Sequence, residues 1–293
     1  MICVGLTLFR STPEQITRIV ALSAASDYPV IAFDNGGVPP DAIADLTRNG
    51  VAVLSAAGNL GIAAALNALA EAAITRGATA LLLLDQDAQA GVSMIRDLEA
   101  AAIRLRDQTP PMAVVGPRPS QIEPDAKAPR YSRRAAIQAV GDLVPVDFLA
   151  TSGSLIDLAA FQQIGPFRVD YFIDAVELEW CFRAWAAGYG CWMTQDVTIG
   201  HRVGAGIIRA PRLGIAMPRQ PLFRMATYLR NSVYGWRLGH IPLRWKLRQA
   251  VYLPVQIALY WRDAGYRPAI LSRLVRAVFD GLAGRLGRPS DAP

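Results

Sequence analysis

Two carboxylates, Asp85 and Asp87, follow four consecutive leucines in the stretch LLLLDQD. The leucines indicate a strand that is buried on both faces, so the acids are expected where this strand leaves its sheet. Because side chains alternate along an extended chain, acids two positions apart point to the same side and can share one cation. Mg²⁺ or Mn²⁺ would suit their oxygens and leave room for substrate phosphates. The pair therefore predicts a metal site at an edge where open α/β sheets bind ligands.

Other interpretations of this pair are a polar strand end, a Walker B strand or the nucleophile of an aspartyl-phosphate phosphatase. The Walker interpretation fails because no G-x-x-x-x-G-K-[ST] occurs, and neither of the two lysines, Lys127 and Lys246, follows a glycine-rich loop. In the phosphatase pattern a Thr or Val stands where this chain has Gln89. The first strand also lacks the G-x-G-x-x-G that a dinucleotide-binding fold places after it.

Further polar residues lie where other strands are expected to end. FDNGG carries Asp34 and Asn35, GNLGIAAALN opens a helix whose N-terminus favours phosphate, and IGHRVG carries His201. A predicted helix in FIDAVELEW carries Glu177 and Glu179. These positions raise the expectation of one ligand site at a single sheet edge.

The elements that must position these residues alternate between strand and helix through the first 120 residues. Thr12 and Pro13 open the first helix as cap and first-turn residue, and glycines end several of the others. Such alternation predicts parallel βαβ units. Residues 119–145 show no clear element. After them we expect a strand, a tight Ser152–Gly153 turn, a strand and a short helix, then the helix with the two glutamates and a last strand.

Composition supports a folded protein of 293 residues, with 52% hydrophobic and 18% charged residues. The start of the chain does not read as a signal peptide, and the longest apolar run near the other end, 251–261, is too short to span a membrane. Three cysteines, Cys3, Cys181 and Cys191, lack metal-ligand spacing, which favours a reducing, cytoplasmic setting.

Charge divides the chain in two. Up to His201 there are 14 Lys and Arg against 21 Asp and Glu, whereas the remainder has 16 against 3. We expect a boundary near residue 205, with a first region of 1–205 and a basic, aromatic-rich helical region of 206–293.

Taken in order, the segments FDNGG, NLGIAAALN, LLLLDQDA, TSGSLI, IGPF, FIDAVELEWCFRAWAAGYG and IGHRVG resemble the family-2 glycosyltransferases of GT-A fold, within them the bacterial rhamnosyltransferase-like branch. The resemblance covers roughly residues 1 to 205. It implies an α/β fold with a Rossmann-like, mostly parallel central sheet flanked by helices, here followed by a C-terminal helical basic appendage.

The resemblance also implies roles for residues of this chain. Asp34 would hold the nucleobase, Asp85 the ribose and a metal, and Asp87 and His201 would complete the metal site. The other substrate-binding residues that it implies, in the matching segments, are Asn35, Asn59, Gly61, Asn67, Ser152 and Gly153.

An inverting transfer needs one base to take the proton of the acceptor hydroxyl. The family's acidic pair usually begins with Asp, and here the sequence has Glu177, which we expect to be the base, with Glu179 orienting it or the acceptor. The longer side chain is a departure from the family pattern, and surface helix acids are the alternative. Asp174 is expected to be structural or to face the acceptor, and Trp180 to stack on a sugar or pack in the core. Arg10 stands where the family commonly has Asn, and we assign it no role.

The basic region has three interpretations. Arginines that alternate with apolar and aromatic residues favour an amphipathic helix on anionic lipid over a nucleic-acid surface, so no nucleic acid is expected. Alternatively, these helices pack on the first region or on a second subunit in a homo-oligomer. Tyr228, Arg230 and Asn231, in the order Y-x-R-N, are similar to a segment found in similar tails.

The resemblance thus predicts a metal-assisted inverting glycosyltransferase that moves L-rhamnose from dTDP-L-rhamnose to a hydroxyl of a surface polysaccharide or lipid-linked glycan. It would act in the cytoplasm, at the inner face of the cell membrane. The alternatives are a UDP-dependent hexosyl- or galactofuranosyltransferase and, from another class, an inactive nucleotide-sugar-binding scaffold at the membrane.

Overall fold

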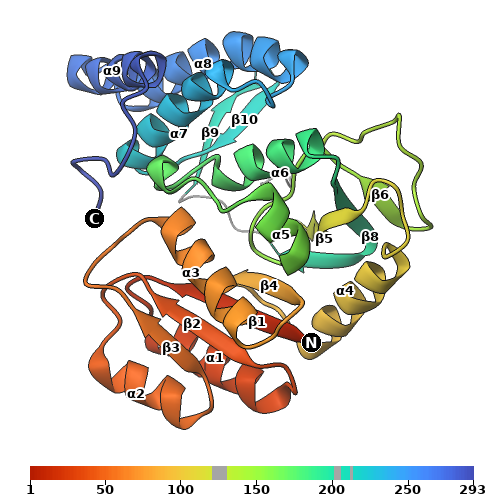
Figure 1. The fold of residues 1–293 in the computed structure, drawn as a ribbon. Coiled ribbons are helices and arrows are strands. Elements are labelled where there is room, and N and C mark those ends of the chain that lie inside the picture. Colours follow the sequence, from red (N-terminus) through yellow and green to blue (C-terminus); the bar gives the residue numbers. More distant parts are fainter. Residues whose placement is uncertain (121–130, 201–205, 212–213) are drawn as a thin grey trace.

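The computed structural model describes residues 1–120, 131–200, 206–211 and 214–293. The first part alternates strands and helices, as the sequence predicts (Figure 1). Its elements are β1 (Ile2–Leu8), α1 (Pro13–Ala25), β2 (Val30–Asp34), α2 (Pro40–Arg48), β3 (Ala52–Ser55), α3 (Ile62–Thr75), β4 (Ala80–Asp85), α4 (Val92–Arg104) and β5 (Met112–Ser120). Thr12 caps α1 as expected: its side chain accepts a hydrogen bond from the Gln15 amide.

The middle of the chain adds β6 (Leu143–Pro145), β7 (Ser154–Asp157), α5 (Leu158–Ile164), α6 (Val176–Ala186) and β8 (Gly190–Gly200). The eight strands form one sheet in the order β3-β2-β1-β4-β7-β5-β8-β6. Four of the seven pairings between these strands are parallel, and those of β4 with β7, β5 with β7 and β6 with β8 are antiparallel. The α/β fold is confirmed, with a mixed sheet. β6 and β7 run against the other six strands of the sheet.

The core lies on both faces of this sheet. Leu81 and Leu83 of β4 belong to the cluster under α3, α5 and α6, while Leu82 and Leu84 belong to the cluster under α1 and α4. All four leucines are buried, so the expectation from LLLL is confirmed. The three cysteines are buried and form no disulfide.

The C-terminal region is built on a third hydrophobic cluster. It contains β9 (Ile207–Ala210), β10 (Ile215–Pro218), α7 (Leu222–Tyr234), α8 (Leu243–Asp263) and α9 (Pro268–Ala283). The antiparallel β9-β10 hairpin was not expected from the sequence. In Figure 1 these helices lie above α6 and the sheet. In the described residues, no helix is long and apolar enough to cross a membrane.

Candidate active site

A cavity of about 730 Å³ opens where β1 and β4 end, between the sheet and the C-terminal helices. Most of the residues predicted from the sequence meet there. Those that line it are Asn35, Asn59, Gly61, Asp85, Asp87, Ser152, Asp174 and Glu177.

The sheet side of the cavity is held by short polar contacts. Asp34 is buried below it, and its Oδ1 accepts the Gly36 amide at 2.8 Å. Asn35 Oδ1 accepts the Leu60 amide at 2.8 Å, which ties the end of β2 to the loop before α3. At Gly61, φ is +85°, and a Cβ there would clash with the Phe172 backbone, so only glycine fits this loop.

Asp85, the last residue of β4, and Asp87 both line the cavity, and Gln86 between them joins two strand ends. The Gln86 side-chain amide accepts from the Phe9 amide at 2.8 Å and donates to its carbonyl at 3.0 Å, which joins the ends of β1 and β4. The Asp85 amide donates to Ser152 Oγ at 3.1 Å. Burial, followed by the charge of Asp87, raises the pKa of Asp85 to about 6.

This pair fits a divalent cation that keeps water and phosphate ligands, because burial and the nearby charge of Asp87 both disfavour the charged form of Asp85, so a neutralising cation is favoured. Within the described residues no group of three or more His, Cys, Asp or Glu side chains forms a metal cage. His201, the third expected ligand, lies outside the described residues.

Glu177 stands on the first turn of α6 and faces the same cavity. Burial is the main cause that raises its pKa to about 7, and the charges of Asp174 and Asp85 act in the same direction, while Arg224 opposes them. Arg224 of α7 pairs with Asp174 at 2.6 Å. Burial raises the pKa of Asp174, and Arg224 opposes this shift only in part.

The backbone that presents Asp174 and Glu177 is held in an unfavourable conformation. Phe172, Asp174 and Ala175 all have φ between +62° and +63°. The side-chain amide of Asn231, on α7, donates to the carbonyls of Tyr171, Ile173 and Asp174, each at 2.9 Å. Asn231 is only 1% exposed, so α7 fixes this segment from the protein interior.

Five predicted residues do not line the cavity. Trp180 is in the core, where Nε1 donates to the Gly165 carbonyl at 2.9 Å, so it cannot stack on a sugar. The side-chain amide of Asn67 bonds the Phe167 backbone with both polar atoms: Nδ2 donates to the carbonyl and Oδ1 accepts from the amide. Gly153 has φ +86° and forms the turn before β7. The remaining two are Asp34, below the cavity, and Glu179.

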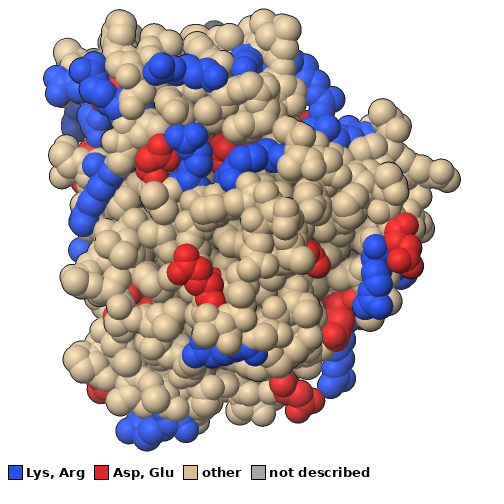
Figure 2. Space-filling view, viewed as in Figure 1, with Lys and Arg blue, Asp and Glu red and all other residues tan. Residues whose placement is uncertain are grey.

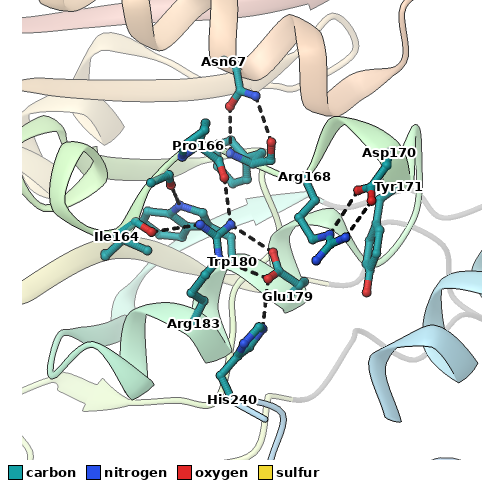
Figure 3. A network of polar contacts seen from close by, with 12 residues as sticks. Asn67, Ile164, Pro166, Arg168, Asp170, Tyr171, Glu179, Trp180, Arg183 and His240 are labelled. Carbon is teal, nitrogen blue, oxygen red and sulfur yellow. Dashed lines mark hydrogen bonds and ion pairs between the residues drawn. The ribbon is translucent and has the colours of Figure 1, made fainter. Parts of the chain in front are cut away.

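Figure 3 shows the network that holds Glu179. Its carboxylate is 2.9 Å from His240 Nε2 and 3.0 Å from Arg183 Nη2. Arg183 also donates to the carbonyls of Ile164 and Pro166. Residues 177 and 179 are two apart on a helix and therefore point to different sides. Glu179 thus ties α6 to the loop after α5 and to the segment before α8.

The sequence analysis did not assign Arg224, Asn231 or the cavity residues of α8 to the site. The wall opposite the sheet includes Tyr228, Trp245, Arg248, Gln249 and Tyr252. Arg224, Tyr228 and Asn231 recur at helical spacing, which would have placed them on one face of a helix. The chain end also reaches the cavity: the Pro293 carbonyl accepts from Asn59 Nδ2 at 3.1 Å.

No family model matches the chain. The dTDP-rhamnosyl transferase RfbF of Shigella flexneri is 23% identical over 249 residues, which are 84% of this chain and 83% of that protein. Among solved structures, S. aureus TarS superposes with a TM-score of 0.61 at 13% identity, over 96% of this chain and 48% of TarS. GalNAc-T7 with UDP, GalNAc and Mn²⁺ gives a TM-score of 0.57 at 13% identity, over 91% and 56%. This chain therefore spans about half the length of these two structures.

Together, the mixed sheet, the cavity at its edge and these relatives define a glycosyltransferase of GT-A fold and family-2-like type. Within this class, the dTDP-rhamnosyl transferase RfbF is similar to this chain along most of the length of both. The family expectation from the sequence is thereby confirmed.

Proposed function

We propose that the chain is an inverting glycosyltransferase that uses Glu177 as its general base. The observation that carries this proposal is the carboxylate of Glu177 in the same cavity as Asp85 and Asp87, with its pKa raised to about 7. A base with a pKa near the working pH is the most effective at taking a proton in the transition state.

In the proposed reaction, Glu177 takes the proton of the acceptor hydroxyl while that oxygen attacks the anomeric carbon of the donor sugar. The bond from this carbon to the nucleoside diphosphate breaks, and the diphosphate oxygen keeps the electron pair. Asp85 and Asp87 would hold Mg²⁺ or Mn²⁺, which would neutralise the charge of the leaving diphosphate. Asn35, Asn59 and Gly61 would form the nucleotide side of the site.

For the donor we propose dTDP-L-rhamnose, on the strength of the printed name of RfbF. The acceptor would be a hydroxyl of a surface polysaccharide or lipid-linked glycan. A UDP-sugar, in a hexosyl- or galactofuranosyl-transfer, is the second candidate, because a TarS structure with UDP-GlcNAc superposes at a TM-score of 0.59 with 12% identity, over 96% of this chain and 80% of that one. An inactive nucleotide-sugar-binding scaffold is the candidate from another class.

The proposal includes a peripheral position at the inner membrane face. Three apolar side chains four residues apart on α8, Leu243, Leu247 and Val251, are 69%, 60% and 74% exposed. Figure 2 shows Lys and Arg gathered over the upper part of the molecule, where the C-terminal helices lie. An apolar stripe beside basic residues suits an anionic lipid surface. Residues 206–293 would thus both contact lipid and complete the cavity begun by residues 1–205.

The test is Glu177→Gln, which keeps the side-chain size and removes the base. We expect sugar transfer to fall by at least about 100-fold, while the affinity for the nucleoside diphosphate changes little. Glu71→Gln, the same change at an exposed position of α3, is the matched control. Equal transfer by Glu177→Gln and wild type would exclude this base, and absence of transfer from any donor would favour the scaffold.

A thermal-shift series with dTDP and UDP, each with and without Mn²⁺, tests the donor. A ligand that binds only the folded state raises the melting temperature. A larger rise with dTDP supports the rhamnose donor, whereas a rise with UDP alone supports the second candidate.

A further inference from the structure

The wall of the cavity that faces away from the sheet is aromatic and carries an arginine. Its residues come from α7, α8 and the loop before β7, and the described ones are Phe148, Tyr228, Trp245, Arg248, Gln249 and Tyr252. None of them belongs to the segments that resemble the nucleotide site. Glu177 lines the same cavity as this wall and the sheet-side acids, so an acceptor hydroxyl beside Glu177 would bring its sugar to this wall.

Two aromatic side chains of this wall, Phe148 and Trp245, are held by ring contacts. Phe148 and Trp245 meet edge to face with ring centroids 5.6 Å apart, and Trp245 also contacts the buried Phe182 at 5.4 Å. The Gln249 side-chain amide donates to Tyr228 Oη at 3.3 Å. Rigid aromatic faces beside fixed polar groups suit a sugar ring, because its C–H face packs on an aromatic ring and its hydroxyls need hydrogen bonds.

Charge distinguishes Arg248 from the other arginine in the lining of the cavity. Arg224 is paired with Asp174 at 2.6 Å. Arg248 is exposed, and its guanidinium lies over the Trp245 ring at 5.5 Å from the centroid. Among the residues that the structure describes, Arg248 has no ion pair with a carboxylate. A guanidinium without a carboxylate partner in the described residues, on a side chain that lines a ligand cavity, is suited to an anionic group of the ligand.

We propose that this wall is the acceptor subsite and that the acceptor is an anionic saccharide: a sugar ring packs on Tyr252 beside Trp245, and Arg248 binds a negative group attached to it. This inference rests on the proposed function. The negative group would be either the diphosphate of a lipid-linked saccharide or the carboxylate of an acidic sugar. Arg248 is one residue from Leu247 of the exposed apolar stripe, a position that suits a diphosphate at a lipid surface.

The experiment measures the binding of three probes by titration calorimetry, with and without saturating dTDP and Mn²⁺. The probes are N-acetylglucosaminyl diphosphate with a ten-carbon isoprenyl chain, methyl glucuronide and neutral methyl glucoside. The variants are Arg248→Gln and Tyr252→Ser, and Arg276→Gln on the exposed side of α9 is the control.

We expect Arg248→Gln to weaken binding of an anionic probe by about 10- to 100-fold, with glucoside binding and dTDP affinity unchanged. Tyr252→Ser should weaken all three probes, and Arg276→Gln should match wild type. If Arg248→Gln loses affinity for the diphosphate probe, the acceptor is a lipid-linked saccharide. If it loses affinity for the glucuronide alone, the acceptor is an acidic sugar.

Equal affinities of wild type and Arg248→Gln for both anionic probes, or no binding of either, would overturn the subsite. Failure of the proposed function gives a different pattern: wild type then binds neither dTDP nor UDP, whereas the probe titrations without nucleotide still report on Arg248.

Discussion

Replacing Asn231 by Leu tests whether the segment before Glu177 is held by α7. The leucine has a similar size but no amide, so the carbonyls of Tyr171, Ile173 and Asp174 lose a donor. At about 1 kcal/mol for a hydrogen bond and up to about 3 kcal/mol for a buried polar group left unsatisfied, we expect a loss of roughly 2–4 kcal/mol in the free energy of unfolding.

The effect on activity should be larger than the loss of folded protein explains. Residues with positive φ store about 1–3 kcal/mol each and persist only when neighbours hold them, so without the amide Phe172, Asp174 and Ala175 should relax. Glu177 would move with them, and a displacement of about 1 Å costs on the order of 100-fold in rate. Denaturant unfolding gives the stability, and kcat with the KM for the donor gives the catalytic effect.

Thr227→Val is the control for this experiment. Thr227 is also buried on α7, but its hydroxyl donates to the Phe223 carbonyl of the same helix, away from the strained segment. We expect it to cost some stability and to leave kcat unchanged. A folded Asn231→Leu protein with the kcat of wild type would refute the argument, because the segment would then keep its geometry without the amide.

The remaining predictions concern protons, metal, packing and lipid. The pKa of Glu177 is raised to about 7, so the fraction of Glu177 in the base form increases with pH around this value. We therefore expect kcat/KM to rise with pH near pH 7, whereas a carboxyl of ordinary pKa would place this rise near pH 4.3. A flat profile of kcat/KM from pH 5 to 8 would contradict this. Asp87→Asn should abolish the part of the dTDP thermal shift that needs Mn²⁺ and keep the metal-free part; an unchanged shift would exclude Asp87 as a ligand. Glu179→Gln should cost about 3 kcal/mol of stability. Burial alone would raise the pKa of Glu179, but hydrogen bonds from His240 and Arg183 hold this pKa below its usual value. The contribution of Glu179 to the free energy of unfolding should therefore be present above the pKa of the unfolded state and be lost as the pH falls. A Glu179→Gln protein as stable as wild type at pH 7 would refute the role of this ion pair. Leu247→Glu should reduce sedimentation with anionic vesicles while activity on a short soluble acceptor persists; equal sedimentation would remove the α8 stripe from the membrane proposal.

The sequence predicts the first half of the fold well because its signals are local. Leu81 to Leu84 are buried on both faces, and Thr12 caps α1, as expected. The position of β7 between β4 and β5 could not be predicted, because both partners are distant in the sequence and no local signal specifies them.

The sequence predicted the cavity residues at strand ends, and predicted the cavity residues on helices less well. Asp85 and Asp87 reach the cavity because a strand end fixes their direction. Glu179 does not, because residues two apart on a helix face different sides, and on its own side Glu179 pairs with Arg183, one turn further along the same helix. The sequence placed Arg224 and Asn231 only within the basic C-terminal region, whose contacts it left open, since charge and composition do not reveal that α7 lies against the strained segment.

The contact between Pro293 and Asn59 has a practical consequence for any experiment on this protein. Residues appended after Pro293, such as an affinity tag, would begin at the rim of the cavity, next to a loop expected to bind the nucleotide. Arg288 strengthens this contact, since it reaches the carbonyls of both Asn59 and Pro293 at 3.2 Å. Donor affinities measured with a tag at this end would therefore report on the tag as well as on the site, and a tag before Met1 is the better choice.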